Sequence, residues 1–263
     1  MKNSNAEIKN RRNLLLAYIK KNQDVTVNHL IDVFNISPAT LRRDLDYLNV
    51  NNYITRSYGR VRINELINSS TDNFLERSKI SIAKYVASQI NEFDTVFINT
   101  SSTAIQVLKY IKKKHVTIIT NNANAIQIDH DSTVMVILTG GELRIPKYSM
   151  VGDFAINAIN RVRANKCILG VNGISPSSGL TAKIAAEASI NQLMVERCDG
   201  TVYVVCDHSK LGKDVAFSSA SLEQIDYIIT DKLADNNIIE QFEQKNIKVV
   251  KVEDDKLQDH SPE

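Results

Sequence analysis

The chain has 263 residues, of which 43% are hydrophobic and 24% charged, as in an ordinary globular protein. It contains no run of 18 apolar residues, and its first residues lack the apolar core of a signal peptide, so we expect a cytoplasmic protein without a membrane partner. Three cysteines without C-x-x-C spacing and five scattered histidines argue against a disulfide framework and a metal site, and we expect no cofactor.

The net charge of +2 is unevenly distributed along the chain. Residues 1–62 hold 11 basic and 5 acidic side chains, whereas the remaining 201 residues hold 21 basic and 25 acidic ones. A basic segment joined to a mildly acidic body is typical of a nucleic-acid-binding module linked to a different domain. We therefore expect two unequal domains.

Apolar side chains with helical spacing predict two helices in the basic segment. The first covers residues 7–22, and its apolar stripe includes Leu14. The second covers residues 27–34, with Thr26 as its N-cap and Val33 among its inward-facing residues. Only two residues separate this second helix from the next helical pattern, which predicts a tight turn.

A third helix is predicted to start at Ser37 and Pro38, within the segment 36–48. Ser37 is a favourable N-cap, and Pro38 fits the first helical position because its missing N–H costs nothing there. Leucines recur at i, i+4 and i+7 on one face, while Arg42 and Arg43 lie on the other. A solvated charged face is one interpretation. The short preceding turn favours the other, a helix-turn-helix whose second helix enters the DNA major groove.

Two short strands are predicted on either side of Gly59, which makes this a winged helix-turn-helix. Arg56, Arg60 and Arg62 lie on or beside this wing, where they can bind the phosphates that flank the groove. The alternative is a winged helix that binds protein instead of DNA. The candidates for DNA binding are Ser37, Ala39, Thr40, Arg42, Arg43, Arg56 and Arg60.

Residues 12–63 resemble the N-terminal domain of the DeoR family of bacterial transcriptional regulators. The family signature T-[IL]-R-R-D-L matches Thr40 to Leu45 residue by residue. Many members continue the wing with a His-Gly-Gly run, where this chain has Tyr58, Gly59 and Arg60. The resemblance implies a winged helix-turn-helix domain over residues 1–63 that binds operator DNA.

The rest of the chain predicts an α/β domain. Residues 64–74 are polar and small and are predicted to be a linker, followed by a domain in residues 75–252 and a disordered tail in residues 253–263. In the domain, short β-branched segments alternate with helical patterns, which indicates a mostly parallel sheet covered on both faces. The predicted strands are 95–99, 116–120, 134–138, 166–169, 201–206, 227–230 and 247–252, and the predicted helices are 75–90, 103–113, 154–162, 185–197 and 236–244.

Polar or glycine-rich residues follow five of these strands, at the sheet edge where open parallel sheets bind ligands. A hydroxyl-rich segment that opens a helix suits an anion, two adjacent glycines let the backbone approach a ligand, and a lysine attracts phosphate. Amide and carboxylate groups can bond sugar hydroxyls. Each feature alone is commonly a cap, a turn or a solvated side chain. The candidates for effector binding are Asn99, Ser101, Ser102, Thr103, Asn121, Gly140, Gly141, Asp207 and Lys210.

The resemblance to the DeoR family extends over residues 7–252. The segments I-T-N, L-T-G-G, L-G-V-N-G-I and D-H-S-K-L-G occur in the order found in the family's sensor domain. The resemblance implies a fold similar to ribose-5-phosphate isomerase and a phosphorylated-sugar effector. The chain departs from the family at Asn99, Ser101 and Asn191, where many members have Asp, Gly and Lys.

These features together predict a repressor of a carbohydrate catabolic operon, controlled by a phosphorylated sugar and acting as a homodimer or homotetramer. The alternative is a sugar-phosphate isomerase fused to a DNA-binding head, with Asp207 and Glu187 as the nearest candidates for a general base. Neither residue has an evident acid–base partner in the sequence. We therefore expect no catalytic residues and no enzyme activity.

Overall fold

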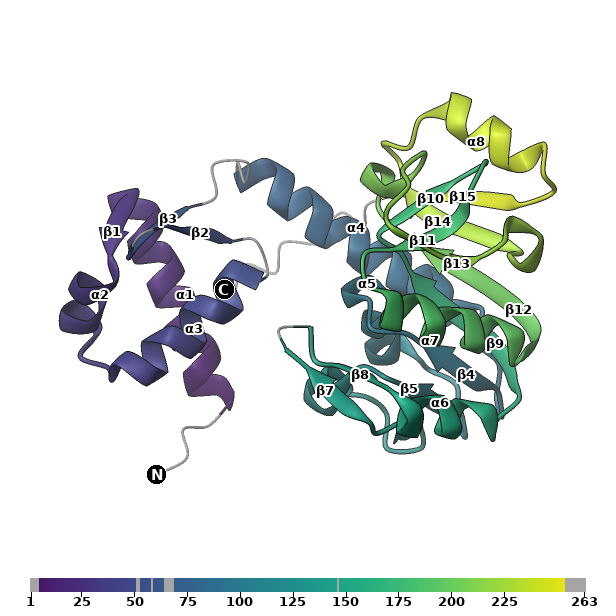
Figure 1. Ribbon diagram of the computed structural model, residues 1–263, viewed down its shortest axis with the longest axis horizontal. Coiled ribbons are helices and arrows are strands. Elements are labelled where there is room, and N and C mark those ends of the chain that lie inside the picture. Colours follow the sequence, from purple (N-terminus) through teal and green to yellow (C-terminus); the bar gives the residue numbers. More distant parts are fainter. Residues whose placement is uncertain (1–4, 51–52, 58, 64–68, 146, 254–263) are drawn as a thin grey trace, which may run out of the picture. The chain divides into compact units, whose positions relative to one another are not determined.

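The computed structural model describes residues 5–50, 53–57, 59–63, 69–145 and 147–253. The chain divides into two compact units, residues 1–73 and residues 74–263 (Figure 1). Helix α4 (Ser69–Ser88) begins within the span predicted as a linker, and residues 64–68 of that span lie outside the described residues. The predicted tail also lies outside them, apart from residue 253.

The first unit is a helix-turn-helix with a three-stranded sheet. Its elements in chain order are α1 (Asn5–Asn22), β1 (Asp24–Thr26), α2 (Val27–Phe34), α3 (Pro38–Val50), β2 (Ile54–Ser57) and β3 (Arg60–Ile63). The sheet is antiparallel with the order β1-β3-β2, so it contains one strand more than predicted. A three-residue strand such as β1 is too short to show the alternation by which strands are recognised in a sequence.

Nine buried apolar side chains form the core of this unit, including Leu15 and Ile19 of α1 and Leu41 of α3. Leu14 and Val33 were predicted to face the core. This prediction was wrong, because Leu14 is 54% exposed and Val33 is 45% exposed. Each lies one residue away from the buried line of its helix, and one residue rotates a side chain by about 100° around the helix axis.

The second unit is built on a seven-stranded sheet in which every pair of neighbours is parallel. Its strands are β4 (Thr95–Ile98), β5 (Thr117–Thr120), β6 (Met135–Leu138), β9 (Ala164–Gly170), β12 (Cys198–Val205), β14 (Tyr227–Asp231) and β15 (Lys248–Val252). They correspond to the seven predicted strands. The order across the sheet is β15-β14-β12-β9-β4-β5-β6.

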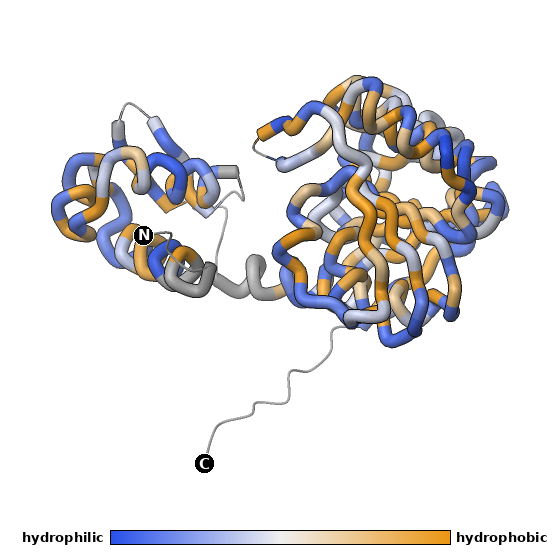
Figure 2. Tube along the Cα trace, turned by 90° about the horizontal axis from the view of Figure 1, so that it is seen from below, coloured by the Kyte–Doolittle hydropathy of each residue, from blue (hydrophilic) through white to orange (hydrophobic). Residues whose placement is uncertain are grey.

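Helices cover both faces of this sheet, which confirms the predicted α/β class. One core lies beneath α4, α5 (Ser102–Ile105) and the 3-10 helix η1 (Gln106–Tyr110). The other lies beneath α6 (Asp153–Asn160), α7 (Ala185–Glu196) and α8 (Asn236–Glu243). Figure 2 shows the apolar strands running between these layers. None of the described helices is both long enough and apolar enough to cross a membrane.

Three features of the second unit differ from the prediction. The helix predicted at 103–113 is a four-residue α-helix followed by the 3-10 helix η1. A small antiparallel sheet joins β10 (Gly173–Ser175), β11 (Gly179–Ala182) and β13 (Phe217–Ala220), and a hairpin joins β7 (Glu142–Arg144) to β8 (Ser149–Val151). These strands have three or four residues each and are paired by tertiary contacts that no local pattern announces.

The strand order creates a switch point between β4 and β9. From β4 the chain builds the sheet outward through β5 and β6, then returns to β9 and builds in the other direction through β12, β14 and β15. The loops that leave β4 and β9 therefore diverge at the carboxyl ends of two adjacent strands. In open α/β sheets, this is the place where ligands bind.

Candidate nucleic-acid interface and effector site

The start of α3 is fixed by its cap. The Thr40 backbone N–H donates to Ser37 Oγ at 3.2 Å, and the two hydroxyl groups of Ser37 and Thr40 lie 2.9 Å apart. Asn35 adopts a left-handed conformation with φ 46°, which ends α2 and turns the chain into α3. The predicted N-cap and the predicted tight turn are both present.

A buried carboxylate holds α3 against α1. Asp44 is 1% exposed, and its two oxygens accept hydrogen bonds from Arg11 Nε at 2.6 Å and Arg12 Nε at 2.8 Å. The guanidinium of Arg12 also lies over the ring of Tyr47, 3.9 Å from its centroid. The sequence analysis did not assign this role to Asp44, because its two arginine partners lie 32 and 33 residues away in the chain.

Arg42 and Arg43 remain on the outer face of α3. Both side chains are exposed, and neither makes an ion pair or hydrogen bond to another residue among those the structure describes. Ala39 is exposed as well, so no large side chain on the first turn stands beside them. This face therefore offers two unpaired guanidinium groups to phosphates or guanine edges.

The arginines of the wing are already paired with acids. Arg60 Nε donates to Asp24 at 2.9 Å and Arg62 to the other oxygen of Asp24 at 2.7 Å, and hydrogen bonds from Arg62 and Arg60 lower the pKa of Asp24 to about 2. Arg56 donates to Asp46 of α3 at 2.5 Å. Exposed ion pairs of this kind are weak, so these arginines can exchange their acids for DNA phosphates.

In the second unit, Asn99 lies at the switch point and links the end of β4 to the end of β9. Its Oδ1 accepts from the N–H groups of Gly170 and Ser101, and its Nδ2 donates to the carbonyl of Gly170 and to Oδ1 of Asn191. Asn99 is 2% exposed. The amide therefore has no free polar position left, and it fixes the loop in place instead of facing the open crevice.

The loop after β4 packs directly on the end of β9. Ser101 caps α5 by accepting from the N–H groups of Thr103 and Ala104 at 3.2 and 3.3 Å. A Cβ built on Gly170 would lie 1.8 Å from Ser101 Oγ, so only glycine fits here. Sequence reasoning noted the glycine-rich end of this strand but did not select Gly170. Thr103 is buried, whereas Ser102 is exposed.

The ends of β5 and β6 meet the β7–β8 hairpin. Asn121 is 1% exposed, and its Nδ2 donates to the carbonyl of Met150 at 3.1 Å, while its Oδ1 has no partner among the described residues. Gly140 and Gly141 both have positive φ. A Cβ on Gly141 would lie 2.4 Å from the carbonyl oxygen of Val151, so this glycine lets the backbone of the loop approach β8.

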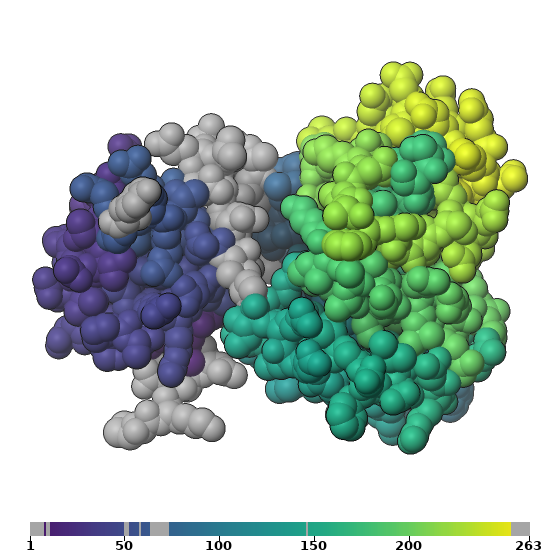
Figure 3. Space-filling model, in the orientation of Figure 1, coloured from purple at the N-terminus to yellow at the C-terminus, as the bar shows by residue number. Residues whose placement is uncertain are grey.

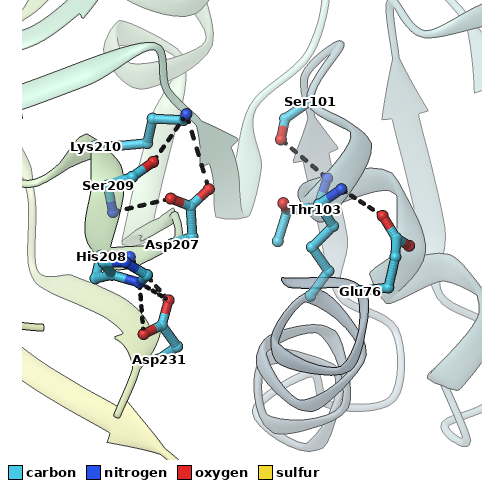
Figure 4. Close-up of polar contacts among 9 residues, drawn as sticks. Glu76, Ser101, Thr103, Asp207, His208, Ser209, Lys210 and Asp231 are labelled. Atoms are coloured by element: carbon cyan, nitrogen blue, oxygen red, sulfur yellow. Dashed lines mark hydrogen bonds and ion pairs between the residues drawn. The ribbon is translucent and has the colours of Figure 1, made fainter. Parts of the chain in front are cut away.

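The loop after β12 carries the predicted lysine. Asp207 caps this loop by accepting from the Ser209 N–H at 2.9 Å, and Lys210 Nζ lies 3.1 Å from Ser209 Oγ and 3.9 Å from Asp207 Oδ2. In Figure 4 the Lys210 amine extends toward the loop that carries Ser101. Lys210 is 38% exposed, so its ammonium is open to a ligand.

Two buried carboxylates lie near these loops. Asp231 was not predicted as a site residue, and Glu187 was predicted only as a candidate general base of the alternative function. Asp231, at the end of β14, is 0% exposed and accepts from the backbone N–H of His208 at 2.8 Å, with His208 Nδ1 at 3.0 Å (Figure 4). Glu187 of α7 is 5% exposed and pairs with Lys147 Nζ at 2.8 and 3.0 Å. The only sequence signal for Asp231 was its position directly after a strand.

The predicted effector residues come from the carboxyl ends of β4, β5, β6 and β12, which with β9 are adjacent in the sheet. A groove of about 580 Å³ lies elsewhere, between α4 and residues 110–113. Among the described residues no group of three or more His, Cys, Asp or Glu side chains could hold a metal ion. The arrangement is suited to binding a small polar anion.

Comparison with known proteins agrees with both halves of this description. Residues 11–66 match the DeoR-like helix-turn-helix domain, and residues 76–232 match the DeoR C terminal sensor domain. These are domains of transcriptional regulators, not of enzymes.

Similar proteins of known name are also transcriptional regulators. The chain is 29% identical to the glycerol-3-phosphate regulon repressor of Escherichia coli over 84% of this chain and 90% of that protein. It is 30% identical to the regulator GlpR of Haloferax volcanii over 91% of this chain and 96% of that protein. It is 26% identical to the repressor GlcR of Bacillus subtilis over 93% and 96%.

Among solved structures, a D-ribose-5-phosphate isomerase matches 52% of this chain and 54% of its own with a TM-score of 0.38 and 16% identity. The family assignment rests on the two domain matches and on the full-length relatives. The chain belongs to the DeoR family of DNA-binding transcriptional regulators.

Proposed function

We propose that this protein represses a carbohydrate catabolic operon by binding its operator as a homodimer or homotetramer, and that a phosphorylated sugar in the sensor unit controls the binding. The observation that carries the DNA contact is the exposed face of α3, where Arg42 and Arg43 have no ion-pair or hydrogen-bond partner among the residues that the structure describes. The wing arginines add phosphate contacts. A DNA-binding regulator of this family that responds to an effector shifts between strong- and weak-binding populations.

The effector proposal is supported by the strand-end loops. Lys210 supplies an accessible positive charge, and the unpartnered Oδ1 of Asn121 supplies a buried acceptor for a hydroxyl. A repressor named for glycerol 3-phosphate is among the similar proteins, which supports a small phosphorylated polyol or sugar. Asp207 is already used as a cap, so it would position Lys210 instead of binding the sugar itself.

Two of the departures from the family compensate each other. Asn99 and Asn191 hydrogen-bond at 2.9 Å, at positions where many members of the family have Asp and Lys. In this chain the contact between the two side chains, which holds the β4 loop, is made by neutral amides. This supports a retained crevice with altered local charge.

DNA binding is tested by fluorescence anisotropy with DNA from the protein's own promoter region, across a range of salt concentrations. Arg43→Ala should weaken operator binding by about 1–3 kcal/mol if it reads a base, with a smaller loss on random DNA. Arg163→Ala, an exposed arginine of the sensor unit, is the matched control. Equal losses on operator and random DNA would rule out base reading, and absence of salt-sensitive binding would rule out the proposal.

Effector binding is tested by thermal shift of the full chain against a panel of pentose, hexose and triose phosphates. A ligand at 100 times its dissociation constant stabilises the folded protein by about 2.7 kcal/mol. The shift should disappear in Lys210→Ala and persist in Lys245→Ala, which removes an exposed lysine from the other edge of the sheet. A panel without any shift would overturn the effector proposal and leave the DNA proposal standing.

A further inference from the structure

We infer that strand β6 is the interface through which two copies of this chain pair, by forming an antiparallel β6–β6 contact that joins their sheets. This inference goes with the proposed binding to paired operator half-sites and adds the surface that brings the copies together. It rests on three features of the strand: a free backbone edge, an uncovered apolar face and a self-complementary geometry.

The backbone edge of β6 is free on one side. Within the described residues β6 is the last strand of the sheet and pairs only with β5. The N–H groups of Met135 and Thr139 donate to the carbonyls of Val116, just before β5, and Thr120 of β5, at 2.9 and 3.0 Å. Because the direction of backbone groups alternates along a strand, the N–H and C=O groups of Val136 and Leu138 point away from β5. Those four groups form an open edge.

One face of the strand is also uncovered. In the sheet register Ile137 lies beside Ile119, which is buried in the core beneath α6 and α7. These helices cover Ile119 but not the residues of β6 on the same face, since Met135 is 60% exposed and Ile137 is 44% exposed. Val136, on the opposite face, packs against the other core. Apolar side chains of β6 are therefore exposed to solvent at this edge of the sheet.

Exposed apolar side chains are frequent in the segment of the chain that contains this strand. Of the thirteen large hydrophobic residues exposed among those described, six lie between residues 126 and 154, namely Ile126, Met135, Ile137, Leu143, Ile145 and Phe154. This segment, coloured teal, contributes to the lower surface of the unit in Figure 3.

A free strand edge beside exposed apolar side chains suits an interface. Exposed apolar patches of several hundred Å² generally mark interaction sites, and a stable interface buries about 800 Å² per partner. Natural edge strands are usually protected by charges, proline or a bulge. Met135 to Leu138 carry none of these protections, so an unprotected edge of this kind is expected to be paired.

The occupant that fits is a second copy. A two-fold axis at Ile137 places Val136 opposite Leu138 of the other chain, so all four outward backbone groups of each strand are paired by one contact. The two Ile137 side chains then meet on the same face, as a non-hydrogen-bonded pair with close side chains. The strand carries no charge that would oppose its own copy. One recognition helix per chain also requires two chains for two half-sites.

The test compares Ile137→Lys with the wild-type chain by light scattering during size exclusion. Ile137 is exposed in the single chain, so lysine should not disturb the fold, but two lysines facing each other across the axis repel. We expect the mass of the wild type to be at least twice 29.5 kDa and the mass of the variant to be halved. Leu233→Lys, at a residue that is 55% exposed away from β6, is the control and should not change the mass.

Hydrogen exchange of the full chain gives the second readout. The amides of Val136 and Leu138 should be protected in the wild type, lose protection on dilution, and be unprotected in Ile137→Lys. Protection that persists in a monomeric Ile137→Lys variant would show that another part of the same chain covers the edge, and would overturn the inference. A monomeric wild type, or an unchanged mass in the variant, would overturn it as well.

DNA binding separates this inference from the proposed function. Ile137→Lys should still bind a single half-site and should lose about 10²-fold in affinity for a full operator, because the two heads are no longer linked. Arg43→Ala should lose operator binding with its mass unchanged. If the wild type pairs through β6 but binds no DNA, the proposed function fails and the interface stands.

Discussion

Replacing Asp44 with asparagine should destabilise the DNA-binding unit specifically. The carboxylate is 1% exposed, and its two arginine partners are 17% and 23% exposed, so all three groups are largely removed from water. Breaking a buried ion pair from one side typically costs 3–5 kcal/mol. Because the arginines can turn partly into solvent, we expect about 3 kcal/mol for the Asp44→Asn variant. A unit of this size has a total stability of roughly 3–9 kcal/mol.

The measurement is hydrogen exchange of the full chain, followed by mass spectrometry. A loss of about 3 kcal/mol corresponds to roughly 10²-fold faster exchange of the protected amides in α1 and α3. Amides of β9 and β12 in the second unit should be unaffected. Operator affinity should fall with the population of the folded unit, even though Asp44 contacts no DNA.

Asp46→Asn is the matched control, because it removes an acid from the same helix. Asp46 is 55% exposed and its partner Arg56 is 30% exposed, so this pair should contribute no more than about 1 kcal/mol. Equal exchange rates in the two variants would refute the idea that burial gives the Asp44 contact its strength. A change that reached the second unit would refute its local character.

Three further predictions concern single residues. Gly170→Ala should cost about 1–3 kcal/mol by overpacking against Ser101 and abolish any effector response, and the double variant with Ser101→Gly should recover stability in thermal melts. The pKa of Asp24 is lowered to about 2 in the folded protein, so its stabilising effect is present above about pH 4 and is lost as the pH falls toward 2; the stability difference between wild type and Asp24→Asn should follow this course in acid titrations. Burial raises the pKa of the Cys206 thiol well above its usual value, so iodoacetamide at pH 8 should modify Cys206 only after unfolding.

The local sequence was sufficient for the helix-turn-helix. Ser37 and Pro38 mark the start of α3, and the leucine spacing identifies its buried face, because capping and helical periodicity depend on residues close together in the chain. The seven strands of the large sheet were equally visible, since each is a short β-branched segment bounded by turn residues. The sequence indicated that Gly170 belongs to a glycine-rich strand end, but not that it packs against Ser101.

The sequence did not reveal the roles of side chains whose partners lie far away in the chain. Asp44 could not be identified as an anchor because its arginines lie 32 and 33 residues away, and Glu187 could not be paired with Lys147 at a separation of 40 residues. Asn99 was predicted to face a ligand, yet its amide is fully used within the protein.

The sequence by itself therefore determined the family, the two kinds of domain and the elements that carry DNA binding, because all of these depend on local patterns and motifs. The tertiary structure decided which polar side chains are structural and which remain open, and it decided the order of the strands. That order places β6 at the edge with Ile137 uncovered. Neighbours across a sheet are set by long-range packing, which no local pattern encodes.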